Sequence, residues 1–211
     1  MRRTADADGL LRVARRVSRG LGVLLVLGVG VAACRAPMPG EERAWRNERE
    51  SSVREELPPA ARAHFKGLRF YAWDPELRFR TVMAPLNPPE PVQIAAANGA
   101  PRPAHRVGRL RLHLPGGKVE LAVYQLDDLS NAYPDALFLP FRDAGAARDT
   151  YGAGRYIDLK RLAGGVVEVD FNRAYNPDCA YGISARCPIT PAENTLSVSV
   201  RAGEMMPLGH G

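Results

Sequence analysis

The clearest pattern in the chain is a strict alternation of polar and apolar residues from 109 to 114. The odd positions hold Arg, Arg and His, and the even positions hold leucine. Successive side chains of a β-strand point to opposite faces, so this segment predicts a strand with one apolar face and one solvated face. The turn sequence Pro115-Gly116-Gly117-Lys118 follows, and residues 119–125 then alternate again. We therefore expect an antiparallel hairpin.

Other short apolar runs bounded by turn residues predict further strands. These runs cover residues 68–73, 77–83, 137–141, 155–159, 166–172 and 196–201. Two proline-rich stretches, 85–91 and 99–103, are expected to be rigid connectors. Together the elements predict a mainly β fold, an antiparallel β-sandwich or barrel of about nine strands with an N-terminal helix.

The N-terminal helix is predicted from residues 41–57, which are rich in charged helix-forming residues. Trp45, Val53 and Leu57 are spaced by eight and four residues, which places them in a thin apolar stripe on one helical face. Pro58 and Pro59 are expected to end the helix. Most of its surface should be solvated.

The first 33 residues have the composition of an export signal. Six arginines precede an apolar run of 13 residues, Leu21 to Ala33. A membrane-spanning helix needs about 20 residues, whereas this length is typical of a signal-peptide core. The run ends in Val31-Ala32-Ala33-Cys34, which resembles the lipobox of bacterial lipoproteins. We expect residues 1–33 to be a lipoprotein signal peptide and Cys34 to carry the lipid. Ordinary secretion with cleavage nearby and an uncleaved anchor are the alternatives.

The position after the cysteine bears on which membrane would hold the anchor. Arg35 stands where an Asp keeps enterobacterial lipoproteins at the inner membrane. The expected location is therefore the cell envelope, on the periplasmic face of the outer membrane. The membrane, reached through lipidated Cys34, is the first expected partner.

The net charge does not favour nucleic acid as a partner. The whole chain carries +6, and the leader accounts for +4 because its six arginines are opposed only by Asp6 and Asp8. The rest of the chain is left with +2, too little for a phosphate-binding surface. We expect no nucleic-acid binding.

Two cysteines remain besides Cys34. Cys179 and Cys187 are separated by seven residues and belong to a chain with an export signal. Disulfides persist in exported proteins, so we expect these two residues to be bonded. The alternative is a thiolate metal site, but no histidine lies within twenty residues of either cysteine. We predict no metal site, and no cofactor can be named.

Polar residues of the kinds used in binding sites gather between Phe138 and Gly203. In the predicted strand 166–172, the odd positions from 167 are apolar and the even positions from 168 are polar. A loop that contains Pro177 and the predicted disulfide follows, and a stiff loop beside a sheet is a common place for a site. The candidate ligand-binding residues are Asp143, Tyr151, Arg155, Tyr156, Asp170, Asn172, Tyr175, Asn176, Glu193 and Asn194.

The same residues also have a structural interpretation. Asn and Asp at strand ends often hold turns by bonding their own backbone. Tyr175 and Tyr181 could cover the core with their hydroxyl groups in water, and Arg155 and Asp170 could form a buried pair. Sequence spacing alone does not decide between a site and a scaffold.

Known enzyme motifs fit poorly. Gly182-Ile183-Ser184-Ala185-Arg186 lacks the last glycine of a nucleophile elbow, and the four histidines are scattered. Asp143, Asp170 and Glu193 could form a paired-carboxylate hydrolase or a hard-cation site only if they converge in space. Whether the protein is an enzyme therefore stays open.

Several longer motifs carry a family resemblance. They are FLPFRDAGAARDTYGAGRY (138–156), VDFNRAYNPDCAY (169–181), CPITPAENTL (187–196) and RAGE (201–204). These motifs resemble domain-of-unknown-function family 1684, and FKGLRFYAWDPELRFR (65–80) resembles the family's FxGLxYFxxDPxxR segment. Family members usually have Pro where Asp178 stands and often Asn-Gly where Gly145-Ala146 stands. The family has no established activity, so the resemblance implies a fold and a site without a reaction.

The chain is thus expected to have five segments: signal peptide 1–33, tether 34–40, helical segment 41–64, β domain 65–204 and tail 205–211. The leading hypothesis is a lipid-anchored envelope protein whose Tyr/Asn/Arg/carboxylate site binds a small ligand or an envelope partner. A hydrolase with paired carboxylates is the second hypothesis. A structural envelope protein without a site is the third.

Overall fold

The computed structural model describes residues 37–208. The predicted signal peptide, Cys34 and the first part of the tether lie outside the described residues, as do the last three residues of the tail. Lipidation at Cys34 therefore stays a prediction. Within residues 37–208, no helix has the length and apolar character needed to cross a membrane.

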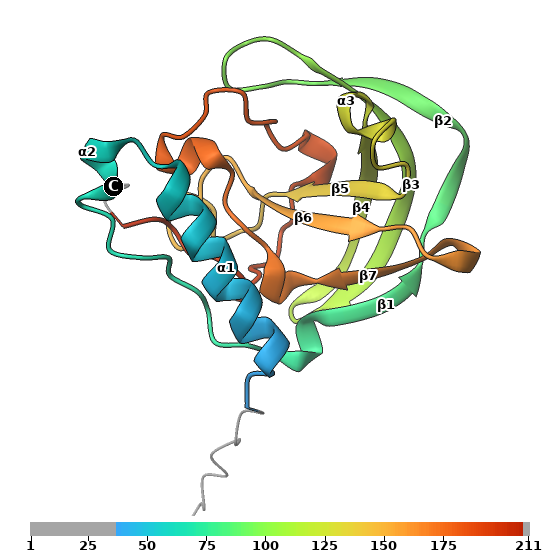
Figure 1. Ribbon diagram of the computed structural model, residues 1–211. Coiled ribbons are helices and arrows are strands. Elements are labelled where there is room, and N and C mark those ends of the chain that lie inside the picture. Colours follow the sequence, from blue (N-terminus) through green and yellow to red (C-terminus); the bar gives the residue numbers. More distant parts are fainter. Residues whose placement is uncertain (1–36, 209–211) are drawn as a thin grey trace, which may run out of the picture. The chain divides into compact units, whose positions relative to one another are not determined.

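The described residues form seven strands, three α-helices and several 3₁₀ turns (Figure 1). The strands are β1 (Arg78–Val82), β2 (Ala84–Ile94), β3 (Arg102–Leu114), β4 (Gly117–Leu126), β5 (Ala136–Phe141), β6 (Arg155–Lys160) and β7 (Val166–Asp170). The α-helices are α1 (Gly40–Glu56), α2 (Pro59–Arg62) and α3 (Asp127–Ser130). The 3₁₀ turns are η1 (Pro75–Leu77), η2 (Ala163–Gly165), η3 (Phe171–Arg173), η4 (Asp178–Tyr181) and η5 (Ala192–Asn194).

The strands form two antiparallel sheets. One has the order β2-β3-β4-β5-β6, and the other pairs β1 with β7. The main apolar core lies between them, where Val167 and Val169 of β7 pack with residues such as Leu110, Leu121 and Leu139 of the large sheet. The prediction of a mainly β, antiparallel fold is confirmed, and the arrangement is sandwich-like rather than a closed barrel.

The predicted hairpin is β3 and β4, with Leu114 paired to Gly117 across the two-residue turn. The even-numbered leucines of β3 are buried, and Arg111 on the opposite face is exposed. Arg111 binds Glu120, its cross-strand partner, at 2.8 Å. The outer face of this hairpin therefore carries solvated ion pairs.

Two predicted strands do not form, because other groups bind their backbones. In residues 68–73, the Leu68 N–H donates to the Glu50 side chain, and only Phe70 makes an isolated bridge, to Glu204. In residues 196–201, the Val200 N–H donates to the carboxylate of Asp143. These backbone contacts to side chains take the place of sheet hydrogen bonds. Because β2 adds a strand that the sequence did not predict, seven strands form where about nine were expected.

The proline-rich stretch 85–91 is a second correction, since it lies within β2 and not in a connector. β2 is an edge strand, and its pairing with β3 shifts register between Pro85 and Glu90. Proline has no N–H to donate, which an edge strand with an irregular register tolerates.

Helix α1 covers the predicted residues within one position at each end. Val53 and Leu57 are buried, as the apolar stripe predicts. Arginines on the same side reach other parts of the fold: Arg49 Nε donates to Glu204 at 3.0 Å, although 155 residues separate the two. The helix is thus fixed to the C-terminal segment by an ion pair that the sequence pattern did not indicate.

The large sheet is apolar on both faces near the end of β4. Leu121 and Val123 point into the main core, whereas Ala122 and Tyr124 belong to a second cluster on the opposite face. The other buried members of that second cluster are Ile94, Ala104, Leu126, Phe138 and Tyr156. An apolar outer face of this kind can form the floor of a binding site.

Candidate functional site

Arg155 and Asp143 form a buried ion pair. Their side chains are each 1% exposed, and Arg155 Nη2 donates to Asp143 Oδ2 at 2.9 Å. Thr150 Oγ1 donates to the other carboxylate oxygen at 2.8 Å. The remaining Arg155 donors bind the backbone carbonyls of Val200, Ala202 and Glu204. The pair therefore holds the C-terminal segment against β6, and its groups are already saturated with protein partners.

The sequence suggested that Arg155 could pair with Asp170. That pairing is wrong, because the partner of Arg155 is Asp143. Asp170 accepts from the backbone and side-chain nitrogens of Asn172 at 3.0 and 2.9 Å. Asn172 in turn bonds both backbone groups of Asp74 at 2.8 Å. Asp170 and Asn172 are thus held in a turn that ties the start of β1 to the end of β7.

Two further predicted asparagines are fully buried and bind the backbone. Asn194 Oδ1 accepts from Ala122 N at 2.8 Å, and its Nδ2 donates to Ala122 O and Pro140 O. Asn176 Nδ2 donates to Met205 O at 2.8 Å and to the Tyr181 hydroxyl at 3.1 Å. Both side chains link segments that lie far apart in the chain.

Glu204, from the RAGE motif, is a buried acceptor that the sequence did not single out. It accepts from Asn176 N at 2.9 Å and from the Tyr181 hydroxyl at 2.6 Å, besides Arg49. The preceding Gly203 has φ +72°, and a Cβ there would lie 2.4 Å from the Ala174 carbonyl oxygen. Only glycine allows the backbone at residue 203 to lie this close to Ala174. This close contact places Glu204 next to the loop that follows η3.

Glu193 belongs to a separate network on the large sheet. It accepts from Arg106 Nη2 at 2.6 Å, from Arg109 Nη2 at 3.0 Å and from the Tyr124 hydroxyl at 2.6 Å. Burial and the hydrogen bond to Glu193 raise the pKa of Tyr124 well above its usual value. Asp143, Asp170 and Glu193 each bind different partners, so these three carboxylates do not converge on one site.

A cleft of about 610 Å³ lies beside the second apolar cluster. Of the ten predicted site residues, only Tyr156 and Tyr175 line it; Tyr151 is half-buried beside Thr150 and lies outside it. The cleft is walled by residues of the segment 96–103, the start of α3, strands β5 and β6, and the loop 175–188. Its volume is in the usual range for small-molecule sites, about 300–1,000 Å³.

Three aromatic rings stand at steep angles in the cleft wall. The Phe138 and Tyr156 rings are 4.8 Å apart at 69°, and the Tyr156 and Tyr175 rings are 5.8 Å apart at 88°. The backbones of Tyr156 and Tyr175 exchange two hydrogen bonds of 2.9 Å, which fix the loop to the edge of β6. The Tyr156 hydroxyl donates to the Pro188 carbonyl. The rings are therefore held in place without a ligand.

Asp158 provides a carboxylate in the same wall. It is two residues after Tyr156 on β6, so both side chains lie on one face of the strand. The Tyr175 hydroxyl lies 3.0 Å from each of its oxygens. Asp158 is an exposed residue at the edge of the cleft. Partial desolvation by the neighbouring protein atoms raises the pKa of Asp158, although the hydrogen bond from Tyr175 and the charge of Arg49 act in the opposite direction.

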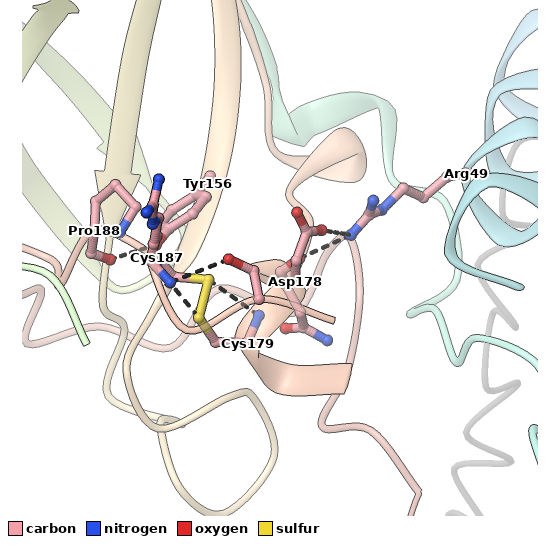
Figure 2. The surroundings of a disulfide bond; sticks show 9 residues. Arg49, Tyr156, Asp178, Cys179, Cys187 and Pro188 are labelled. Carbon is pink, nitrogen blue, oxygen red and sulfur yellow. Dashed lines mark hydrogen bonds and ion pairs between the residues drawn. A yellow bond between two sulfur atoms is a disulfide. The ribbon is translucent and has the colours of Figure 1, made fainter. Parts of the chain in front are cut away.

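Asp178 is the second carboxylate of interest in the cleft. Figure 2 shows Arg49 reaching it from α1, with Nη2 3.9 Å from Oδ1. Arg49 makes closer contacts to Glu204 and to the Asn176 carbonyl, at 3.0 and 2.8 Å. Asp178 is therefore only weakly neutralised. Burial raises its pKa in spite of Arg49.

Two arginines and a third carboxylate complete the charged groups of the cleft. Arg102 and Asp128 bind each other through three contacts of 2.9–3.1 Å, so their charges cancel. Arg186 is exposed, and its guanidinium has no ion-pair partner among residues 37–208. The positive charge of Arg186 is thus the one unpaired cation of the described cleft lining.

The predicted disulfide is present between Cys179 and Cys187. Cys187, Pro188 and Asp178 all line the cleft, so the bond closes the loop that forms one wall (Figure 2). The prediction that this bond stiffens the loop after β7 agrees with its position. Among residues 37–208, no group of three or more His, Cys, Asp or Glu side chains is arranged to hold a metal ion.

Sequence reasoning missed most of the cleft residues. The alternation on β6 placed Tyr156 and Asp158 on one face, and this was the available signal for Asp158. The approach of the segment 96–103 and of α3 could not be read from local patterns, because it depends on how the hairpin packs. A smaller cavity of about 270 Å³ lies elsewhere, next to Phe65, Tyr181 and Leu208.

Comparison with known proteins agrees with the motifs. Residues 63–205 match the model of a family described as protein of unknown function, DUF1684. The chain belongs to this family. A solution NMR structure of an uncharacterised protein from Haloarcula marismortui is 30% identical and superposes with a TM-score of 0.62, covering 81% of this chain and 95% of that chain. No curated protein matches the chain significantly. The DUF1684 match thus supports the family resemblance without giving an activity.

Proposed function

We propose that this DUF1684 protein is anchored to the cell envelope through a lipid on Cys34 and binds a small ligand in the cleft between β6 and the loop 175–188. The observation that carries this proposal is the cleft itself, with three aromatic rings and the Asp158 carboxylate in one wall. Walls of apolar and aromatic side chains with a few fixed polar groups are typical of small-molecule sites.

The residues of this ligand site differ from those predicted from the sequence. Tyr156 and Tyr175 remain in it, whereas Asp143, Arg155 and Asn194 are occupied by buried structural contacts. A purely structural envelope protein has no need of a cleft with preorganised rings. The cleft therefore favours the binding hypothesis over the structural one.

The envelope location rests on the leader and on the disulfide. The lipobox-like Val31-Ala32-Ala33-Cys34 supports lipidation, and Arg35 supports the outer membrane. A disulfide between Cys179 and Cys187 is in keeping with an exported domain. The lipid anchor would then hold the domain in the periplasm, where it would bind its ligand.

A hydrolase is the second candidate, and one observation favours it. Asp158 and Asp178 line the same cleft, and burial raises the pKa of both carboxyl groups. A carboxyl group with a raised pKa that shares a cleft with a second carboxylate is a feature of sites that use general acid catalysis. The pair that the sequence suggested, drawn from Asp143, Asp170 and Glu193, is replaced by these two residues.

The test is whether the protein carries a small molecule in the cleft. We expect protein purified in mild detergent from the envelope of its own host to release a defined compound on denaturation, detected by mass spectrometry. Ala100 is an exposed residue of the cleft lining, so Ala100→Trp should fill the cleft and abolish the bound compound. Ala44→Trp, on the exposed side of α1, is the matched control and should retain it.

Equal amounts of the compound in both variants, or none in the wild-type protein, would contradict binding in the cleft. The hydrolase candidate makes a different prediction for the same compound. If the cleft is catalytic, the purified protein should convert it over time, and Asp158→Asn and Asp178→Asn should each stop the conversion while Ala44→Trp does not.

A further inference from the structure

The chemistry of the cleft wall indicates which kind of ligand it takes. We propose that the cleft binds an organic cation, whose ammonium group is held by Asp158 against the rings of Tyr156 and Tyr175. This inference rests on the proposed binding function and adds the chemical class of the ligand.

The aromatic rings carry the first part of the argument. The face of an aromatic ring is electronegative and attracts a cation within about 6 Å of its centre. The rings of Phe138, Tyr156 and Tyr175 all line the cleft, and neighbouring rings are inclined by 69° and 88°. Phe138 and Tyr156 are largely buried, so the half-buried Tyr175 is the ring most open to a ligand. Tyr175 already accepts one cation, since the Arg49 guanidinium lies 5.0 Å from its ring centroid.

Asp158 supplies the second part. An ionised carboxylate has about four acceptor sites, and the Tyr175 hydroxyl can fill only one with its single hydrogen. Within residues 37–208 no ion pair neutralises Asp158, and Arg49 acts on it only at longer range. A bound ammonium group would occupy the open acceptor sites and supply the opposite charge.

The charge balance of the lining gives the third part. The Arg102–Asp128 pair is neutral, and Arg49 is shared between Glu204 and the more distant Asp178. The cleft lining therefore has more uncompensated negative than positive charge, with Arg186 alone on the positive side. An anionic ligand would meet one exposed guanidinium and two carboxylates. A cationic ligand would meet two carboxylates and the aromatic side chains of the wall.

The experiment compares three probes that have the same alkyl body and different charge: n-butylammonium, n-butanol and butyrate. Binding is followed by amide chemical shifts of cleft residues in the protein without its leader, residues 35–211, at neutral pH. We expect n-butylammonium to bind at least tenfold more tightly than the other two. Asp158→Asn should weaken n-butylammonium binding at least tenfold, and Arg186→Gln should leave it unchanged or tighten it.

Each other outcome overturns the inference in a distinct way. Preferred binding of butyrate that is lost in Arg186→Gln would make the site an anion site. Equal binding of the three probes would show apolar contact alone. No binding of any probe, together with a co-purified compound that Ala100→Trp removes, would reject the cation while leaving the proposed binding function intact. Absence of both would reject the two proposals together.

Discussion

The Tyr175 hydroxyl lies 3.0 Å from both oxygens of Asp158, at the edge of β6. The contact follows from two local features. Asp158 stands two residues after Tyr156, and Tyr175 pairs with Tyr156 through two backbone hydrogen bonds. One short bridge therefore places two rings and a carboxylate in the same wall of the cleft.

Replacing Asp158 should not destabilise the protein at neutral pH. Because burial raises the pKa of Asp158, the folded state holds its proton more tightly than the unfolded state does. The unfolded state has the usual aspartate pKa of about 3.9, and the folded state has a higher pKa. As the pH rises from the lower pKa through the higher one, the folded state loses stability, and it does not regain it at higher pH. Asp158→Asn should therefore melt at the same or a higher temperature than the wild type at pH 7, with the difference shrinking toward pH 3.

The groups that bear on this titration come from several elements: Tyr175, Arg49, Arg102, Asp128, Asp178 and Arg186. Glu168→Gln is a suitable control, because Glu168 on β7 forms an exposed ion pair with Arg80 on β1. Its melting temperature should change little. A lower melting temperature for Asp158→Asn at pH 7 would mean that Asp158 is a structural residue. It would also remove the reason to place a ligand beside it.

Asp143 and Asp170 should differ sharply in their effect on folding. Asp143→Asn leaves Arg155 charged and buried without its partner, which costs about 3–5 kcal/mol and should lower the melting temperature by roughly 6–20 °C. Asp170→Asn keeps an acceptor for the Asn172 backbone, and Asn caps a turn about as well as Asp, so the change should stay within about 1 kcal/mol. Thermal melts of the two variants measure this, and comparable losses would contradict the assigned partners.

The Cys179–Cys187 bond should stabilise the fold by limiting the unfolded chain. For a loop of this length the chain-entropy model gives about 2–3 kcal/mol, so Cys187→Ser should lower the free energy of unfolding by that amount. Denaturant unfolding measures the change, with the reduced wild type as the control. Two free thiols in protein recovered from the envelope, or a metal released by thiol reagents, would be inconsistent with the bond.

The polar-apolar pattern was sufficient for the core of the fold and insufficient for the site. Alternation in β3 and β4 determines which leucines and valines are buried, and this depends on local sequence alone. Polar residues near Asp170 and Asn194 suggested a site because their types are those of binding residues. Their real partners are backbone groups up to 98 residues away, which no spacing rule reveals.

The wrong prediction for residues 85–91 has the same kind of origin. Prolines predict a connector locally, but an edge position in the sheet removes the need for the missing N–H groups. The cleft was missed because its walls come from parts far apart in the chain: the segment 96–103, α3, strands β5 and β6, and the loop 175–188. Of the cleft residues, only Tyr156 and Tyr175 were among the predicted site residues.

Lipidation at Cys34 is open to a direct test. Cys34→Ala should abolish incorporation of labelled fatty acid and leave an unprocessed or soluble product, because the thiol that would carry the lipid is gone. Cys187→Ser serves as the control, since it removes a cysteine without touching the leader. Labelled fatty acid in the Cys34→Ala protein would reject the anchor.

The most direct test of cation binding is the pKa of Asp158 itself, followed by the chemical shift of its carboxyl carbon during a pH titration. In the free protein we expect a pKa above the usual value for aspartate, since burial disfavours the charge. Saturation with n-butylammonium should lower this pKa, because a neighbouring cation favours the ionised form. A pKa that stays unchanged in the presence of bound probe would contradict the proposal that Asp158 holds the cation.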